Sequence, residues 1–250
     1  LAQAAHWMTS FVNPNNHALD GGRATSALEL ETIQALGTMV GYSQPLGHLT
    51  SGGTTANLEA LWVARQCHAK TVVLANEHAH YTHSRMSEVL GMPFQAVAST
   101  ENGSMDLIAL ETMLKELRSE GVNATVVATL GTTGMGAVDA LEDIVPLAHT
   151  YDARIHVDAA YGGYFTLADL PFNTLRHFNA MSSANSIVID PHKHGLQPYG
   201  CGAVLFKNPE EGRFYKHDSP YTYFTSDQLH LGEITLECSR AGAAAAALWA

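Results

Sequence analysis

One lysine stands in an unusual context for the chemistry that it could do. The chain contains five lysines, and only Lys193 follows a strongly apolar run, residues 186–190, among histidines and glycines. A lysine amine that is partly removed from water has a lowered pKa, which suits imine formation with a carbonyl ligand. A structural lysine whose charged end reaches solvent is the alternative for this segment taken alone.

An acid occupies a comparable position at the end of another apolar run. Asp158 follows residues 154–157, and two alanines and two glycines lie close behind it. A carboxylate at the end of a buried strand is costly unless a cation or hydrogen-bond donors meet it. The small residues favour a flat ligand lying against the strand end, whereas an aspartate that caps the next turn is the alternative.

Two glycine-rich segments could line a ligand site. Gly52 and Gly53 lead directly into a helical pattern, so the backbone N–H groups there could bind an anion such as phosphate. No lysine follows this turn, which excludes a nucleotide P-loop, although an ordinary turn before a helix remains the alternative. Residues 131–136 have G-x-x-G-x-G spacing, which differs from the dinucleotide fingerprint and indicates a loop that lines a pocket.

Three histidines, His78, His80 and His83, have spacing that could suggest a metal site. Zinc sites need three or four convergent ligands, and a chain with fourteen histidines produces such spacings by chance. We therefore expect no metal. An imidazole stacked on an aromatic ligand explains one of these histidines as well.

The elements that must position these residues alternate along the chain. Short apolar runs predict strands at residues 71–75, 94–98, 124–130, 154–157, 186–190 and 202–206. Amphipathic patterns predict helices at residues 55–68, 82–90, 107–120 and 140–151, with Asp106 and Asp139 as N-caps and Gly121 at a C-terminus. This alternation predicts one α/β domain with a mostly parallel sheet flanked by helices, whose ligands gather at the carboxyl ends of the strands.

Composition excludes several classes of partner. The net charge is −11 and no Lys or Arg run occurs, so neither nucleic acid nor an anionic membrane is expected as a partner. No apolar stretch reaches 18 residues, and three cysteines without a C-x-x-C pair indicate reduced thiols in a cytoplasmic protein. The chain begins without Met and stops inside a helical pattern at residues 241–250, so we expect a fragment.

Several segments together resemble the group II pyridoxal-phosphate (PLP) dependent amino-acid decarboxylases, the family of aromatic amino-acid, tyrosine, histidine and glutamate decarboxylases. The resemblance covers nearly the whole chain. The matching motifs are TSGGTxANLEAL at 50–61, AHY at 79–81, TLGTT at 129–133, HVDAAYGG at 156–163 and DPHK at 190–193. The last two, taken together, are the most specific.

The resemblance implies a role for each matching residue. Lys193 would hold PLP as a Schiff base, and Asp158 would pair with the pyridine nitrogen. His80 would stack on one face of the ring, and Ala160 would pack on the other. The remaining implied positions are Gly53, Thr54 and Ser186 at the phosphate, Thr133 and Asp139 lining and bracing the site, and His192 beside the Schiff base.

The family also places a proton-donating tyrosine in a loop that reaches a neighbouring subunit. Here that loop is residues 216–232, and the position is Tyr221, Tyr223 or Phe224; we take Tyr223 as the catalytic residue. A Phe there is associated in some relatives with oxidative formation of an aldehyde. Asp190 stands where many animal members carry Asn and several microbial members carry Asp, which indicates a subgroup difference.

The implied fold is the large domain of fold type I, the aspartate aminotransferase-like PLP enzymes. Residues 1–45 would form a substrate-side segment, 46–235 the PLP-binding domain, and 236–250 the start of a helix toward a C-terminal domain. The implied enzyme is a homodimer that converts an L-amino acid into an amine and CO2. Another PLP lyase or an aldehyde-forming homologue is the alternative, and a non-catalytic homologue would usually have lost Lys193 or Asp158.

Overall fold

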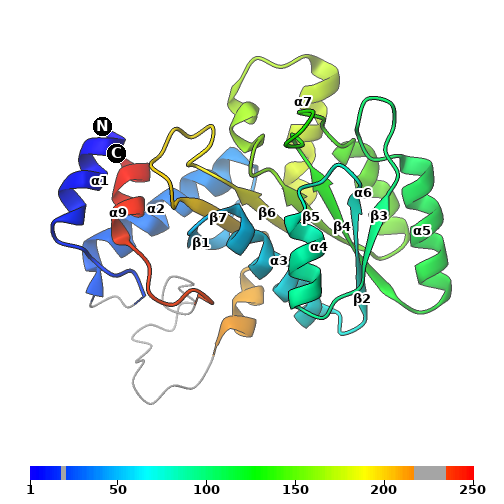
Figure 1. Ribbon diagram of the computed structural model, residues 1–250, viewed down its shortest axis with the longest axis horizontal. Helices are drawn as coiled ribbons and strands as arrows, with labels where there is room; N and C mark the ends of the chain where they lie inside the picture. Colours follow the sequence, from blue (N-terminus) through cyan, green and yellow to red (C-terminus); the bar gives the residue numbers. More distant parts are fainter. Residues whose placement is uncertain (18–20, 217–234) are drawn as a thin grey trace.

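The computed structural model describes residues 1–17, 21–216 and 235–250. A seven-stranded sheet with the order β1-β7-β6-β5-β4-β2-β3 forms its centre (Figure 1). The strands are β1 (Leu46–Thr50), β2 (Thr71–Asn76), β3 (Phe94–Val97), β4 (Asn123–Thr129), β5 (Arg154–Asp158), β6 (Ser186–Ile189) and β7 (Gly202–Phe206). Neighbouring strands from β3 to β6 run parallel, whereas β7 is antiparallel to β1 and β6. The predicted, mostly parallel sheet is confirmed.

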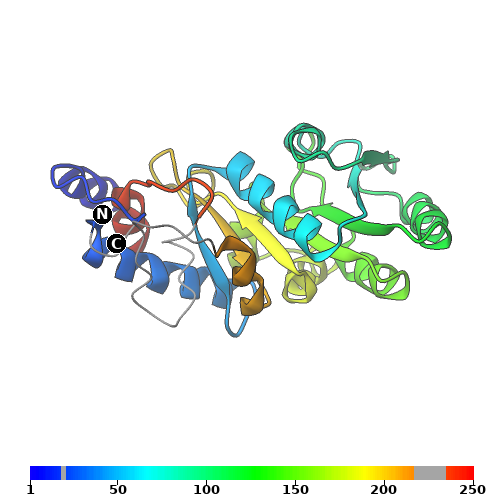
Figure 2. The same cartoon turned by 90° about the horizontal axis from the view of Figure 1, so that it is seen from below.

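Helices cover both faces of this sheet (Figure 2). The helices are α1 (Ala2–Ser10), α2 (Arg23–Met39), α3 (Gly53–Cys67), α4 (Thr82–Val89), α5 (Leu107–Ser119), α6 (Leu141–Thr150), α7 (Phe172–Asn179) and α9 (Gly242–Trp249). One core contains apolar residues of α3 and α4, and the core on the opposite face contains those of α2, α5 and α6. Alternate residues of a strand serve the two cores, as with Val73 and Leu74 of β2.

The helix ends agree with the sequence at two positions and differ at one. The Asp106 carboxylate accepts hydrogen bonds from the N–H groups of Ile108 and Ala109, which confirms the predicted N-cap of α5. Gly121 follows that helix with φ +70°, as expected of a C-terminal glycine. Asp139 does not cap α6, because Ala140 occupies the N-cap position and makes no side-chain cap.

Asp139 instead braces the carboxyl edge of the sheet. Its buried carboxylate accepts from the N–H of Met105 at 2.6 Å, the N–H of Thr129 at 2.7 Å and Asn76 Nδ2 at 2.9 Å. Since Asn76 ends β2 and Thr129 ends β4, one side chain ties together two strand ends that border the site.

Three elements near the start of the chain, α1, α2 and β1, were not predicted. Strand β1 contains Gly47 and His48, and it lacks the β-branched run that marks the other strands. Helix α2 packs against β1 and α9, and α9 also packs against α1, so the two chain ends lie beside each other (Figure 1). Within the described residues, no helix has both the length and the apolar character needed to cross a bilayer.

Candidate active site

A cavity of about 400 Å³ opens at the carboxyl edge of the parallel strands. The connections after several strands contribute its walls, because the carboxyl ends of parallel strands meet at one edge of a sheet. The lining residues are Ser51–Thr55 at the start of α3, His80–Thr82 after β2, Thr129, Gly131 and Thr133 around the end of β4, Asp158, Ala160 and Tyr161 at the end of β5, and Asp190, His192, Lys193 and Tyr199 after β6.

Asp158 is the last residue of β5, and both of its carboxylate oxygens accept hydrogen bonds. His83 Nε2 donates to Oδ2 at 2.8 Å, and the N–H of Ala160 donates to Oδ1 at 3.0 Å. Burial alone would raise the pKa of this carboxyl, but the hydrogen bond and charge of His83 and the Ala160 N–H lower the pKa well below its usual value. Asp158 is therefore an anion at the cavity wall.

His83 has a structural role that the sequence did not reveal. It lies in α4, is fully buried, and directs Nε2 at Asp158. Among the described residues, no group of three or more His, Cys, Asp or Glu side chains could hold a metal ion. The contact joins residues 75 positions apart, so no local spacing signals it.

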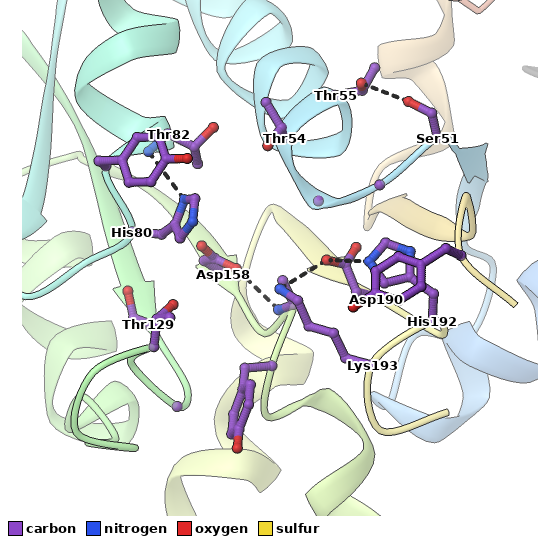
Figure 3. A pocket seen from close by; sticks show the side chains of 18 residues that line it. Ser51, Thr54, Thr55, His80, Thr82, Thr129, Asp158, Asp190, His192 and Lys193 are labelled. Atoms are coloured by element: carbon purple, nitrogen blue, oxygen red, sulfur yellow. Dashed lines mark hydrogen bonds and ion pairs between the residues drawn. The ribbon is translucent and has the colours of Figure 1, made fainter. Parts of the chain in front are cut away.

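Lys193 extends from the turn after β6 into the same cavity. Its Nζ lies 3.0 Å from Asp190 Oδ2, and about a third of the side chain (36%) is exposed. Figure 3 shows Lys193, Asp190 and Asp158 together opposite the first turn of α3. The cavity thus joins the amine and the acid that the sequence singled out.

His192 adjoins this lysine and has a defined orientation. Its ring stacks on Tyr199, with ring centroids 4.9 Å apart. The N–H of Cys201 donates to His192 Nδ1 at 3.2 Å, so the neutral ring carries its proton on Nε2. Nε2 lies 3.5 Å from Asp190 Oδ2, so that its proton faces this oxygen.

The start of α3 forms another wall of the cavity, against Asp190. The first N–H groups of a helix have no partner within the helix and carry partial positive charge, which favours an anion. Gly53 is required there, because a Cβ on this residue would lie 2.7 Å from Asp190 Oδ2. Gly53 and Thr54 both line the cavity, as the sequence predicts for an anion site.

Three further predicted residues line the cavity. His80 accepts a hydrogen bond at Nδ1 from the N–H of Thr82, and burial lowers the pKa of its ring. The ring is stacked on Tyr81 with centroids 4.4 Å apart. Ala160 and Thr133 also line the cavity, the first of them buried.

The assignment of Ser186 to the phosphate is wrong. Ser186 begins β6 rather than following it, and it is not among the lining residues. It is fully buried, with its hydroxyl 2.9 Å from His156 Nδ1. The loop candidates Tyr221, Tyr223 and Phe224 lie outside the described residues.

The donor set fits a ligand with three distinct chemical ends. A carboxylate suits a protonated ring nitrogen, an amine suits an aldehyde, and a helix start suits a phosphate. Asp158, Lys193 and Gly53 provide these groups around a single cavity. The residues present are therefore the ones that PLP requires.

Comparisons with known proteins agree with this geometry. A family model described as pyridoxal-dependent decarboxylase conserved domain matches residues 1–250. The chain is 33% identical over 261 residues to an L-2,4-diaminobutyrate decarboxylase of Acinetobacter baumannii, covering 92% of this chain and 50% of the relative. It is 34% identical over 230 residues to a probable L-aspartate decarboxylase of Halobacterium salinarum, covering 90% and 62%.

The fold is also found in solved structures. A crystal structure of mouse CSAD superimposes with a TM-score of 0.88 at 24% identity, covering 98% of this chain and 54% of that chain. The chain thus spans 50% to 62% of the length of the two relatives named above. Since the family model extends over every residue of the sequence, the chain belongs to the pyridoxal-dependent decarboxylase family.

Proposed function

We propose that this protein binds PLP and decarboxylates an L-amino acid, releasing the corresponding amine and CO2. One observation carries the proposal: Lys193 and Asp158 line the same cavity, opposite the start of α3. The family described above and the decarboxylases that resemble this chain support the same reaction.

Each wall of the cavity would hold one end of the cofactor. The Lys193 amine would bind the aldehyde end, and the Asp158 carboxylate would accept a hydrogen bond from the protonated ring nitrogen. Because His83 and the Ala160 N–H keep Asp158 ionised, the positive charge at that nitrogen would be stabilised. Gly53 and Thr54 would bind the phosphate at the helix start.

The remaining residues would orient the reaction. When bound, PLP supplies an electron sink for the electron pair left on the substrate as CO2 departs. His80 would fix the plane of the ring from one face while Ala160 packs on the other, and Thr133 would line the pocket beside it. His192 would lie beside the substrate, and Tyr223 would return a proton to the substrate carbon.

The assembly and location are part of the same proposal. We propose a cytoplasmic homodimer in which the loop containing Tyr223 completes the neighbouring subunit's site. The proposed large domain spans residues 46–235, preceded by the substrate-side segment 1–45, and 236–250 leads toward a C-terminal domain. The decarboxylase relatives support an amino-acid substrate.

A product assay tests the reaction. The full-length protein, loaded with PLP, is incubated with a panel of L-amino acids while CO2 and amine are quantified. We expect equal amounts of both from at least one amino acid, and loss of both in the Lys193→Ala variant. Aldehyde, ammonia and peroxide in place of amine would contradict the proposal and favour an oxidative reaction on the same scaffold.

A further inference from the structure

The carboxylate of Asp190 lies between two basic side chains on the floor of the cavity. Its Oδ2 atom is 3.0 Å from Lys193 Nζ and 3.5 Å from His192 Nε2. We propose that Asp190 takes a proton from Lys193 when the lysine amine engages an aldehyde, and returns that proton when the lysine is released. This inference depends on the proposed function of Lys193 as the cofactor-holding residue.

The two buried acids of the cavity have different partners. Both oxygens of Asp158 accept hydrogen bonds, which stabilises its charge. Asp190 is only 2% exposed, and its Oδ1 has no hydrogen-bond partner among the described residues. A buried carboxylate with one unpaired oxygen is more costly as an anion than one with both oxygens paired, and it accepts a proton more readily. Asp158 is therefore suited to hold charge, and Asp190 to exchange a proton.

The charged and titratable groups around Asp190 come from four segments. Lys193 and His192 face it from the turn after β6, and the negative charge of Asp158 acts on it from β5. His80, in the segment after β2, also interacts electrostatically with Asp190. The Cys201 thiol lies before β7, where burial raises its pKa to about 12, so it stays uncharged. Burial raises the pKa of Asp190, and Lys193 and His192 oppose this shift only in part.

The proposed step balances in protons and electrons. Lys193 begins as an ammonium, and one proton moves from Nζ to Asp190 Oδ2. The neutral amine attacks the aldehyde carbon, a carbon–nitrogen double bond forms, and the two amine hydrogens leave with the carbonyl oxygen as water. When a substrate amine replaces Lys193, the bond to Nζ breaks, the substrate's amine hydrogens move to Nζ, and Asp190 returns its proton. No electrons are gained or lost.

The experiment follows how fast Lys193 captures PLP at different pH values. The full-length apo-protein is mixed with PLP, quenched with borohydride at set times, and the label on the Lys193 peptide is quantified by mass spectrometry. The variants are Asp190→Asn, which keeps the shape of the side chain, and Asp190→Ala. Neither side chain can accept a proton.

The two mechanisms of proton loss give different pH dependences. With Asp190 as the acceptor, we expect the wild-type capture rate to change little between about pH 6 and pH 9. In both variants the proton must leave to water, so the rate should rise steeply with pH over this range. At neutral pH the variants should be about 100-fold slower or more, as is typical of losing a positioned proton acceptor.

Asp152→Asn provides a matched control, because Asp152 is an exposed carboxylate paired with Arg118 on the surface. This variant should keep the wild-type rate and slope. Either folded Asp190 variant could instead keep the wild-type pH slope and only carry less PLP label on Lys193. In that case Asp190 merely positions the lysine, and the inference is overturned. If wild-type Lys193 is not labelled at all, the proposed function fails instead.

Discussion

At the scale of single residues, burial and hydrogen-bond donors compete to set the pKa of each buried carboxylate. Two donors keep the pKa of Asp158 low, whereas burial raises the pKa of Asp139 despite its three donors. Asp190 has one oxygen without a partner in the described part of the chain. The sequence indicated the importance of Lys193 and Asp158, because each follows an apolar strand. It could not indicate the role of His83, because the contact with Asp158 forms only once α4 is packed against α3 and β2.

A substitution at His83 tests how Asp158 keeps its charge. His83→Leu removes the donor to Oδ2, and hydrogen bonds to charged groups contribute about 1.5–3 kcal/mol. We expect the free energy of unfolding at neutral pH to fall by about this amount, measured by urea denaturation. His83→Gln, whose side-chain N–H can still donate, should recover part of the loss.

The pH dependence of this effect has a definite sign. The folded-state pKa of Asp158 is lowered, so its contribution to stability is present above the unfolded-state pKa of about 3.9 and is lost as the pH falls below it. The difference between wild type and His83→Leu should therefore shrink in acid below about pH 4. A difference that stays constant or grows there would contradict the assigned hydrogen bond.

At the scale of secondary-structure elements, buried hydrogen bonds join the anion-binding end of α3 to β5. His156 Nε2 lies 2.8 Å from Asn57 Oδ1, and Asn57 Nδ2 donates to the carbonyl oxygen of Gly53 at 2.8 Å. Burial lowers the pKa of His156 to about 3, so the ring is neutral and donates through Nε2. Strand β5 thereby positions both Asp158 and the turn proposed to hold the phosphate.

An Asn57→Leu variant separates this positioning from general stability. Loss of a buried hydrogen bond of about 1–2 kcal/mol corresponds to roughly 5–30-fold in affinity. We expect PLP binding to the apo-protein to weaken by such a factor, while pyridoxal, which lacks the phosphate, binds nearly as before. Fluorescence titration with both ligands measures the ratio, and equal weakening of the two would contradict a role through the phosphate turn.

Most elements could be predicted from the sequence, because each carries its own local signal. Strand β7 was predicted at its exact bounds, and β2 to within one residue, from their buried apolar runs. Strand β1 was missed because its residue types are explained only by its pairing with β7. Gly47 is needed there, since a Cβ at this position would lie 2.4 Å from the Val204 carbonyl oxygen. Ser186 was misplaced because its role came from the family resemblance, although the predicted strand at 186–190 puts this residue at the amino end, away from the cavity.

At the scale of the whole molecule, a buried ion pair joins segments from both ends of the chain. Arg240 lies 2.6 Å from Glu29 Oε1 and donates to the carbonyl oxygen of Leu49 at 2.8 Å, and the Leu49 N–H donates to the same Glu29 oxygen at 2.9 Å. Leu49 lies in β1, just before the turn into α3. The sequence could not predict this junction, because it joins residues 211 positions apart.

A Glu29→Gln variant should destabilise the protein strongly, because it leaves the partly buried Arg240 charge without the Glu29 carboxylate. Breaking a buried ion pair costs about 3–5 kcal/mol, which urea denaturation measures directly. Glu31→Gln, in the same helix but exposed, keeps an oxygen that can accept the hydrogen bond from Trp249 and should change stability by no more than about 0.5 kcal/mol.

The pH profile of Glu29→Gln provides an independent check. Burial would raise the pKa of Glu29, but Arg240 and Asn16 lower it below its usual value. Its contribution is therefore present above about pH 4.3 and is lost in more acidic solution. We expect a shallower loss of stability in acid for the variant than for the wild type; parallel curves would contradict the assigned pair.

The most direct measurement is the site at which borohydride fixes PLP to the full-length protein. The proposed function expects one pyridoxyl group on the peptide that contains Lys193, and none in the Lys193→Ala variant. Label found instead on Lys70, Lys115, Lys207 or Lys216, or a protein that takes up no label, would contradict the claim that this lysine and Asp158 hold opposite ends of one ligand.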